Sequence, residues 1–280
     1  MDVVLDLLKW PLLACTVLPV LLVYFGLHVV RREIIFVDLA LAQVATLGIC
    51  LCVMLGHDAR EPHTWLWSAG FTVAGALLFT LTRADGPQRV PQEALIGIVY
   101  VVAAAASILL LSRSSAGKEE LQAILVGDVV NVKWDQVWKA GALYAVVAVV
   151  HALCRRQFFL LSFEPARAKA EGLNVRAWDF LFYALFGLVV TSFVEIGGVL
   201  LVFSFLIVPA VCANLLARSF TAMLLTGWAV AALSSATGIW VSYKADLPTG
   251  AAIVCTLGAA LVLVAVWAKL RPPVKPAPPA

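Results

Sequence analysis

The stretch that decides the fold is Ser162–Asn214, SFEPARAKAEGLNVRAWDFLFYALFGLVVTSFVEIGGVLLVFSFLIVPAVCAN. It begins with a charged segment in which Pro165 suits the first turn of a helix and Gly172 suits its end. Two apolar runs follow and meet at Glu195-Ile196-Gly197-Gly198. This order predicts a water-exposed helix flanked by membrane spans, an element that a membrane protein presents to a soluble partner.

The composition places the rest of the chain in the membrane as well. Of the 280 residues, 62% are hydrophobic and 13% are charged, and the mean hydropathy is +0.97, which excludes an ordinary water-soluble domain. A spanning helix needs about 20 mostly apolar residues. The runs that approach this length are Trp10–Val30, Ile34–Gly56, His63–Thr82, Ala94–Ser112, Val137–Cys154, Asp179–Glu195, Gly197–Leu216, Phe220–Tyr243 and Thr249–Trp267.

The number of spans has two readings. The sixth and seventh runs are nearly continuous and the fifth is short, so eight spans is the alternative to nine. The runs lack the alternation over about ten residues that a membrane β-barrel requires. The sequence therefore predicts an all-α fold, a polytopic membrane helical bundle with 8–9 transmembrane helices. Residues 1–271 are expected to form one transmembrane domain, and residues 272–280 a disordered, proline-rich tail.

The basic residues indicate the orientation in the membrane. With nine spans and residues 155–179 in the cytoplasm, thirteen of the 20 lysines and arginines fall on the cytoplasmic side. This bias predicts that the charged loop and the C-terminus are cytoplasmic. The N-terminus is then outside with nine spans and inside with eight. The net charge of +3 follows from the same rule and gives no reason to expect nucleic acid as a partner.

Two polar side chains of the second run are candidates for a polar pathway. Asp38 lies about five residues inside the run, where a carboxylate is costly and marks a functional site by default. The alternative reading is a carboxylate that caps the helix start or reaches the interface. Gln43 follows among small residues, which favour close helix packing.

Further polar groups stand at the outer ends of the runs. The loop 57–63 carries His57, His63 and two carboxylates, a ligand set that suits zinc or manganese, and a solvated loop is the alternative reading. Glu195 is either a metal ligand or an interfacial carboxylate near the positive end of the next helix. The segment Ile124–Val130 is too short to span, so it is expected to be interfacial or re-entrant and to pack on the bundle.

Six segments in order carry a resemblance to a known family. They are Ala40-Leu41-Ala42-Gln43 with Gly48, Glu93–Val99, Leu125-Val126-Gly127-Asp128, Phe163-Glu164-Pro165 with Ala168 and Gly172, Val199–Ala210, and Asp246–Ala251. The family patterns that they resemble are A-L-(S/A)-H…G, E/D-x-x-I-G-I-V, L-F-G-D, F-D-P-E-x-A…G, G-x-L-L-V-x-A-L-L-I-x-P-A and D-x-P-T-G-A. From about Ile34 to Leu270, the chain is thus similar to the membrane permease subunit of bacterial ABC importers for zinc, manganese or iron(II).

The resemblance implies a role and a set of partners. The chain would be a multi-pass permease of the bacterial cytoplasmic (inner) membrane, acting in membrane lipid as a homodimer. Its partners would be two ABC ATPase subunits and an extracytoplasmic metal-binding protein. The segment Phe163–Gly172 would be the coupling helix that docks on the ATPase, through Phe163, Glu164, Pro165, Arg167, Ala168 and Gly172. The transported divalent metal is then the substrate, no cofactor is bound permanently, and ATP is held by the partner.

The sequence itself agrees with a transport subunit that does not hydrolyse ATP. No G-x-x-x-x-G-K-[ST] phosphate loop occurs in the 280 residues, so we do not expect an enzyme. The candidates for metal contact at the pathway or its mouth are Asp38, Gln43, Glu195, His57 and His63.

One departure from the family pattern concerns the pathway. The family usually places an aspartate four residues before its histidine, whereas here Gln43 stands at the histidine position and Asp38 one residue early. On a regular helix these two side chains are about 140° apart, and a single π-bulge would realign them. A glutamine carbonyl can help to bind hard ions such as manganese but does not replace an imidazole for zinc. We therefore expect weak metal binding here, with selectivity set by the binding protein.

Rival functions remain open. A proton-coupled secondary transporter is also all-helical, but it generally needs ionisable residues near mid-membrane, whereas Asp38 and Glu195 lie near span ends. A permease for siderophores or cobalamin shares the same logic and usually has a longer chain. A membrane anchor of a respiratory complex would need paired histidines for haem, which adjacent runs do not supply.

Overall fold

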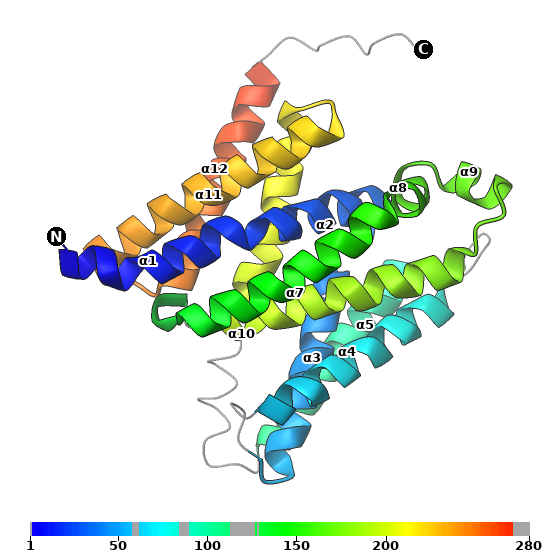
Figure 1. Ribbon diagram of the computed structural model, residues 1–280, viewed down its shortest axis with the longest axis horizontal. Coiled ribbons are helices and arrows are strands. Elements are labelled where there is room, and N and C mark those ends of the chain that lie inside the picture. The colour runs from blue at the N-terminus through cyan, green and yellow to red at the C-terminus, as the bar shows by residue number, and fades with distance from the viewer. Residues whose placement is uncertain (1, 58–61, 84–89, 113–126, 128, 271–280) are drawn as a thin grey trace.

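The computed structural model describes residues 2–57, 62–83, 90–112, 127 and 129–270. Within these ranges the regular elements are helices (Figure 1), which confirms the all-α prediction. They are α1 (Asp2–Val17), α2 (Pro19–Arg32), α3 (Val37–Met54), α4 (Pro62–Thr82), α5 (Gln92–Leu111), the 3-10 turn η1 (Val129–Asn131), α7 (Trp134–Leu153), α8 (Arg155–Phe163), α9 (Pro165–Ala170), α10 (Val175–Leu216), α11 (Phe220–Ala245) and α12 (Thr249–Leu270).

Eight helices in the described part of the chain are long and apolar enough to cross a membrane. Helices α1 and α2 together supply one span, Leu8–Arg32, because Leu18 between them keeps helical backbone angles and Pro19 fits the first turn of α2. The 42 residues of α10 would measure about 63 Å as one straight helix, twice the thickness of about 30 Å that a span crosses. This helix therefore cannot be a single straight span.

Helix α10 is divided at Gly198. That residue has φ 74° and ψ 167°, a region that is essentially restricted to glycine, and Figure 1 shows the helix changing direction between its two halves. The junction predicted at Glu195–Gly198 is thus confirmed. With α10 counted as two, the described helices offer nine candidate spans by length and composition, within the 8–9 that the sequence predicts.

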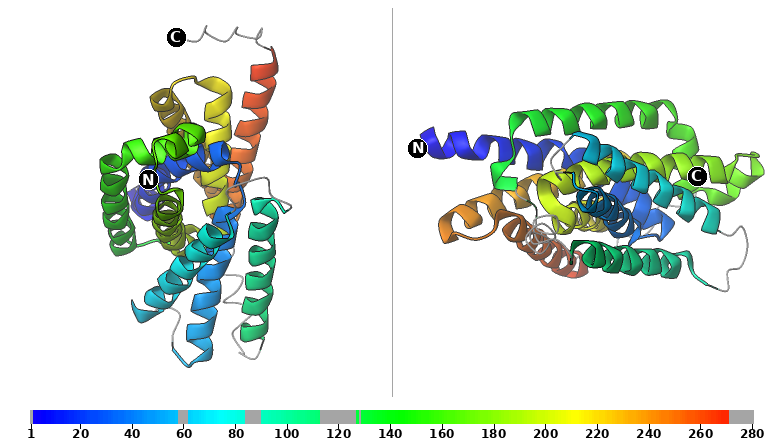
Figure 2. Two further views of the ribbon diagram at one scale, coloured as in Figure 1. Left: turned by 90° about the vertical axis from the view of Figure 1, so that its right-hand side faces the viewer. Right: turned by 90° about the horizontal axis from the view of Figure 1, so that it is seen from below.

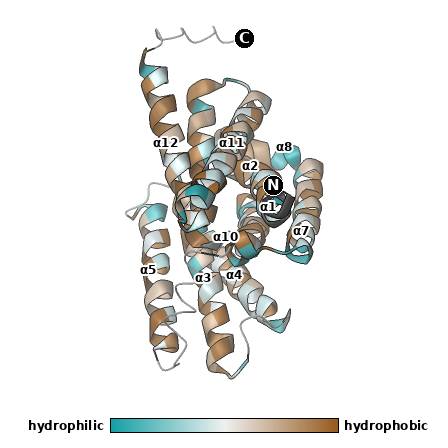
Figure 3. Ribbon diagram, turned by 90° about the vertical axis from the view of Figure 1, so that its left-hand side faces the viewer, coloured by the Kyte–Doolittle hydropathy of each residue, from teal (hydrophilic) through white to brown (hydrophobic). Residues whose placement is uncertain are grey.

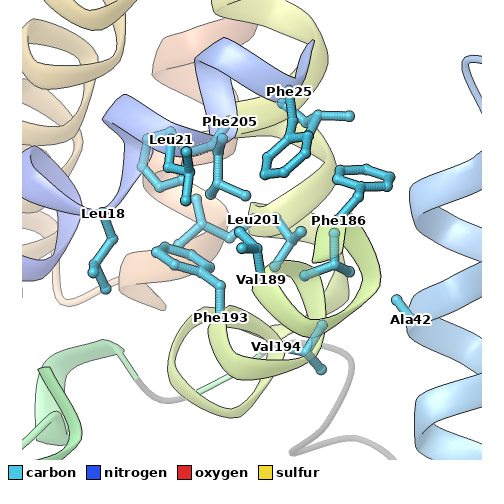
Figure 4. Packing of buried hydrophobic residues seen from close by; sticks show 14 of the residues in the cluster. Leu18, Leu21, Phe25, Ala42, Phe186, Val189, Phe193, Val194, Leu201 and Phe205 are labelled. Carbon is cyan, nitrogen blue, oxygen red and sulfur yellow. The ribbon is translucent and has the colours of Figure 1, made fainter. Parts of the chain in front are cut away.

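Helix α10 is also the centre of the bundle. It packs against α2, α3, α4, α7, α8, α11 and α12. Figures 1 and 2 show α3, α4 and α5 grouped on one side of it, with α1, α2, α11 and α12 on the other. Aromatic side chains fill the centre, where Phe25 of α2 lies beside Phe186 of α10, with ring centroids 5.0 Å apart (Figure 4).

Close backbone contact fixes how α2 meets α10. A Cβ atom on Gly26 would lie 2.0 Å from the carbonyl oxygen of Leu206, so only glycine fits there. Helices in lipid gain little from the hydrophobic effect and associate through such close packing. The outer faces remain apolar (Figure 3): Val101 of α5 and Leu263 of α12 are among the exposed hydrophobic side chains. These faces suit contact with lipid chains.

The described part of the predicted re-entrant segment packs on the α10 kink. A Cβ atom on Gly127 would lie 2.1 Å from the carbonyl carbon of Gly197, and Val129 is only 2% exposed. The turn η1 also contacts α1 and α12. These contacts confirm that this segment packs on the bundle. Residues 124–126 and 128 lie outside the described residues.

Candidate functional site

Asp38 is buried in the first turn of α3. Its side chain is 1% exposed, and neither carboxylate oxygen has a hydrogen-bond partner among the described residues. Buried polar atoms are nearly always paired, so an unpaired carboxylate needs an explanation. This burial does not fit the reading of Asp38 as a carboxylate that reaches the interface, whereas its place in the first turn of α3, with the backbone N–H groups of Asp38 and Leu39 beside the carboxylate, still fits a cap at the helix start.

Gln43 is also buried, at 4% exposure, but it does not share a face with Asp38. Helix α3 is α-helical at every residue, so the π-bulge that would realign the two side chains does not occur in it. Ala42, one turn beyond Asp38 on the same face, points from α3 toward α10 (Figure 4). Gln43 lies about 140° around the helix from Asp38.

The two loop histidines lie together near the junction of α3 and α4. The ring centroids of His57 and His63 are 4.5 Å apart, in an edge-to-face arrangement. His63 also lines an open groove of about 480 Å³ along α4, together with Trp67 and Phe71. The two loop carboxylates, Asp58 and Glu61, lie outside the described residues. Among the residues that are described, no three or more His, Cys, Asp or Glu side chains are grouped so as to hold a metal ion.

Glu195 lies just before the α10 kink. Its side chain is exposed, three residues ahead of Gly198, and Lys139 of α7 is near enough to act on its charge. It does not join the histidine pair or Asp38 in a single group within the described chain. The five sequence-predicted metal candidates are therefore distributed over several places rather than gathered at one.

The charged segment forms the short helix α9, as its sequence predicts. Pro165 is the first residue of the helix, and Gly172 follows it with φ 72°, a left-handed conformation that favours glycine. Ala168 is fully buried against Leu160 and Leu161 of α8. This contact anchors one face of α9 and leaves the other face exposed.

The exposed face of α9 is held by ion pairs. Arg167 donates to Glu164 Oε2 at 3.0 Å and to Glu171 Oε1 at 2.9 Å, and Arg156 of α8 donates to Glu171 Oε2 at 2.7 Å. Hydrogen bonds to Glu164 and Glu171 raise the pKa of Arg167 above its usual value, so this guanidinium stays charged. Phe163, at the end of α8, stacks on Phe159 with ring centroids 4.5 Å apart. The result is a braced, charged surface, which Figure 1 shows at the edge of the bundle.

A buried ion-pair network near α9 was missed by the sequence analysis. Asp179 of α10 is fully buried, accepts from Arg32 Nη1 at 2.9 Å and is paired with Arg83 as well. Arg32 also donates through Nε to Ser162 of α8 at 2.8 Å, and the Ser162 hydroxyl is bonded to His28 Nδ1. The sequence did contain a signal for Asp179, because this carboxylate belongs to an apolar run, and the same observation identified Asp38 as a candidate.

Comparison with known proteins gives concordant results. The pattern of the family described as "ABC 3 transport family" matches residues 4–269. The manganese transport system membrane protein MntC of Listeria monocytogenes is 28% identical over 229 residues, which cover 82% of this chain and 79% of that protein. A probable iron transport system membrane protein of Haemophilus influenzae is 28% identical over 183 residues, or 65% of this chain and 67% of that protein.

Solved structures share the fold. PsaBC from Streptococcus pneumoniae in complex with Fab has a TM-score of 0.77 at 22% identity. The match covers 92% of this chain and 90% of that one. An inward-facing conformation of a putative metal-chelate type ABC transporter has a TM-score of 0.69 at 18% identity, covering 92% of this chain and 85% of that one. Nearly the whole chain falls within the family match and the helices follow the same fold: this protein belongs to the ABC 3 transport family.

Proposed function

We propose that the chain is the membrane permease subunit of an ABC transporter that imports a divalent transition metal. The observation that carries this proposal is the match to the transport family over residues 4–269. The relatives named for manganese and iron transport support a transition metal as substrate. The protein would act as a homodimer in the bacterial inner membrane, with an extracytoplasmic metal-binding protein that delivers the ion.

A separate ATPase subunit supplies the energy in this proposal, and it docks at Phe163–Gly172. Helix α9 supports this role because one face is anchored by Ala168 while the Arg167 face is exposed and charged. The helix is already formed without a partner, and Arg167 is paired on its surface with Glu164 and Glu171. A preformed docking element loses less free energy to ordering when its partner binds.

The transported ion would contact side chains from the mouth to the interior. His57 and His63, with adjacent rings, are the proposed first ligands at the mouth, and Glu195 offers a carboxylate beside the kink. Asp38 is the proposed interior ligand because its buried oxygens are unpaired in the described structure. Gln43 lies about 140° around α3 from Asp38, so in this proposal its amide oxygen, which suits manganese better than zinc, contacts the ion separately from Asp38. A sparse set of ligands suits an ion that must leave again.

Measurements of metal uptake under two kinds of energy depletion test the proposed function. Cells with and without the gene would be supplied with manganese, iron(II) or zinc, under ATP depletion and separately under an uncoupler with ATP maintained. We expect gene-dependent uptake that stops with ATP depletion and persists with the uncoupler. Loss of uptake under the uncoupler alone would establish a secondary transporter. Absence of any free-ion uptake would instead favour the metal-chelate class of substrate.

The Asp38→Asn variant should nearly abolish uptake while leaving the protein in the membrane. Asparagine keeps the shape and removes the charge that attracts the cation. We expect a loss of at least about tenfold, because even outer partners of metal ligands typically change affinity by about 10–100-fold. Uptake and membrane abundance are measured together. The control is Asp135→Asn, since Asp135 has a side chain that is 61% exposed and should tolerate the change. Undiminished uptake in Asp38→Asn would remove Asp38 from the pathway.

The Gln43→His variant should change ion preference rather than abolish transport. An imidazole binds zinc well, whereas an amide oxygen does not replace it. We expect the zinc-to-manganese uptake ratio to rise several-fold in cells supplied with both ions. The matched control is Gln43→Asn, which keeps an amide. If the ratio is the same in all three proteins, position 43 does not tune the ion.

A further inference from the structure

A cavity of about 420 Å³ lies beside α9, where the ends of two membrane spans meet the short helix α8. It does not overlap the metal candidates. Its walls come from α2, α8, α9 and the start of α11, which are far apart in the sequence. The lining residues are Tyr24, His28, Arg155, Arg156, Phe159, Leu160, Glu164, Arg167 and Phe220.

The interior of this cavity is aromatic and apolar. The ring of Phe220 lies at centroid distances of 5.9 Å from Tyr24, 5.7 Å from His28 and 6.2 Å from Phe159. The buried ring of His28 is held through Nδ1 by Ser162, 2.8 Å away, so this wall is fixed in orientation. A ligand that fills this space therefore has an apolar portion.

The rim of the cavity is basic. Three arginines line it against one carboxylate, that of Glu164. Arg167 is bonded to Glu164 and Glu171, and Arg156 to Glu171. Arg155 is exposed and has no ion pair within the described part of the chain. It is the cation that remains available to a negative group, and it accounts for the net positive charge of the rim once Glu164 and Glu171 are counted.

The cavity lies beside the ends of the Leu8–Arg32 and Trp134–Leu153 spans, from which we infer that it is at the level where a membrane changes from hydrocarbon to headgroups. Leu153, at the end of the α7 span and two residues before Arg155, is 79% exposed, as expected of a side chain in contact with lipid chains. The cavity wall Phe159 is 40% exposed. Helix α8 begins directly beyond Leu153 and is hydrophilic where Figure 3 shows it. Basic pockets between spans at this level suit anionic lipid headgroups.

We propose that this cavity is a binding site for an anionic phospholipid. Arg155 pairs with the phosphate, and the glycerol and upper chain region rest on Phe159 and Phe220. A soluble protein partner explains the site less well, because the apolar walls belong to the ends of membrane spans and adjoin the lipid-exposed Leu153. The bound lipid would brace α8, and with it α9, against the spans. The proposal goes beyond the transport function and does not depend on which ion is carried.

Thermal unfolding of the purified permease with its ATPase subunit in detergent tests the site. The probes are dioctanoyl phosphatidylglycerol, dioctanoyl phosphatidylcholine and glycerol phosphate. We expect phosphatidylglycerol to raise the unfolding temperature in a saturable way, with little effect of the other two. In Arg155→Gln the apparent affinity for phosphatidylglycerol should fall about fivefold, the contribution of one basic side chain near an anionic surface. The control is Arg218→Gln, another exposed arginine at this end that does not line the cavity.

Four outcomes would overturn the proposal. Equal stabilisation by phosphatidylcholine would mean that the cavity does not select an anionic lipid. Equal stabilisation by glycerol phosphate would identify a free phosphate site without a lipid chain. An unchanged affinity in Arg155→Gln would place lipid binding elsewhere. No stabilisation of the complex by phosphatidylglycerol would mean that the cavity does not hold the lipid, and would leave the ATPase subunit as its occupant. None of these results bears on metal uptake, so failure here is distinct from failure of the proposed function.

Discussion

Replacing Asp179 by alanine should destabilise the protein by about 3–5 kcal/mol, the usual cost of removing one partner from a buried ion pair. Asp179 is fully buried and compensates Arg32, whose side chain is 5% exposed. Without the carboxylate, Arg32 retains its bond to Ser162 and its position over the Phe182 ring, 3.9 Å from the centroid, but neither neutralises the charge. Helices α2 and α10 would then separate at the α9 end of the bundle, or fail to assemble.

Thermal or denaturant unfolding in detergent measures this loss. The control is Asp135→Ala, since Asp135 is exposed and paired only with Lys139 at 3.6 Å, an arrangement worth little. Combining Asp179→Ala with Arg32→Met should recover part of the lost stability, because it removes the buried and uncompensated Arg32, while the less buried Arg83 still loses its partner. A loss in Asp179→Ala no larger than that in Asp135→Ala would show that the pair does not hold these helices.

The sequence was sufficient for features that depend on neighbours in the chain. Apolar runs predicted the spans because a helix must satisfy its own backbone in lipid, so length and composition decide the outcome. The break in α10 followed from the meeting of two apolar runs at Glu195–Gly198, and the bounds of α9 from Pro165 and Gly172. In each case a local backbone preference agrees with the final structure.

Features that depend on distant parts of the chain were not predictable in the same way. The Asp179 pair joins residues 147 positions apart, and nothing near Arg32 indicates its partner. The sequence raised a π-bulge that would align Asp38 with Gln43, but α3 is regular. Such a bulge depends on packing against other helices, which one segment cannot reveal. Burial of Asp38 at 1% likewise results from the helices around it.

The Gly127→Ala variant should lose about 2–4 kcal/mol, from overpacking and left-handed backbone strain together. The added methyl would lie 2.1 Å from the carbonyl carbon of Gly197 and 2.3 Å from the nitrogen of Gly198, both backbone atoms that cannot turn aside. Gly127 has a φ of 69°, so alanine would also be strained in its backbone, and movement of neighbouring side chains would not relieve that strain. Relief requires that the segment leave the kink of α10.

The matched control is Gly141→Ala in α7, where a Cβ atom meets nothing within 4 Å and alanine should be neutral or stabilising. Unfolding in detergent separates the two variants, and equal stabilities would mean that the Gly127 contact is not tight in the protein.

Because Gly127 presses on the kink beside Glu195, its displacement should also change the outer end of the proposed pathway. Metal uptake per folded molecule should therefore fall in Gly127→Ala and stay normal in Gly141→Ala. Normal uptake per folded molecule in both variants would show that the Gly127 contact affects stability and not transport.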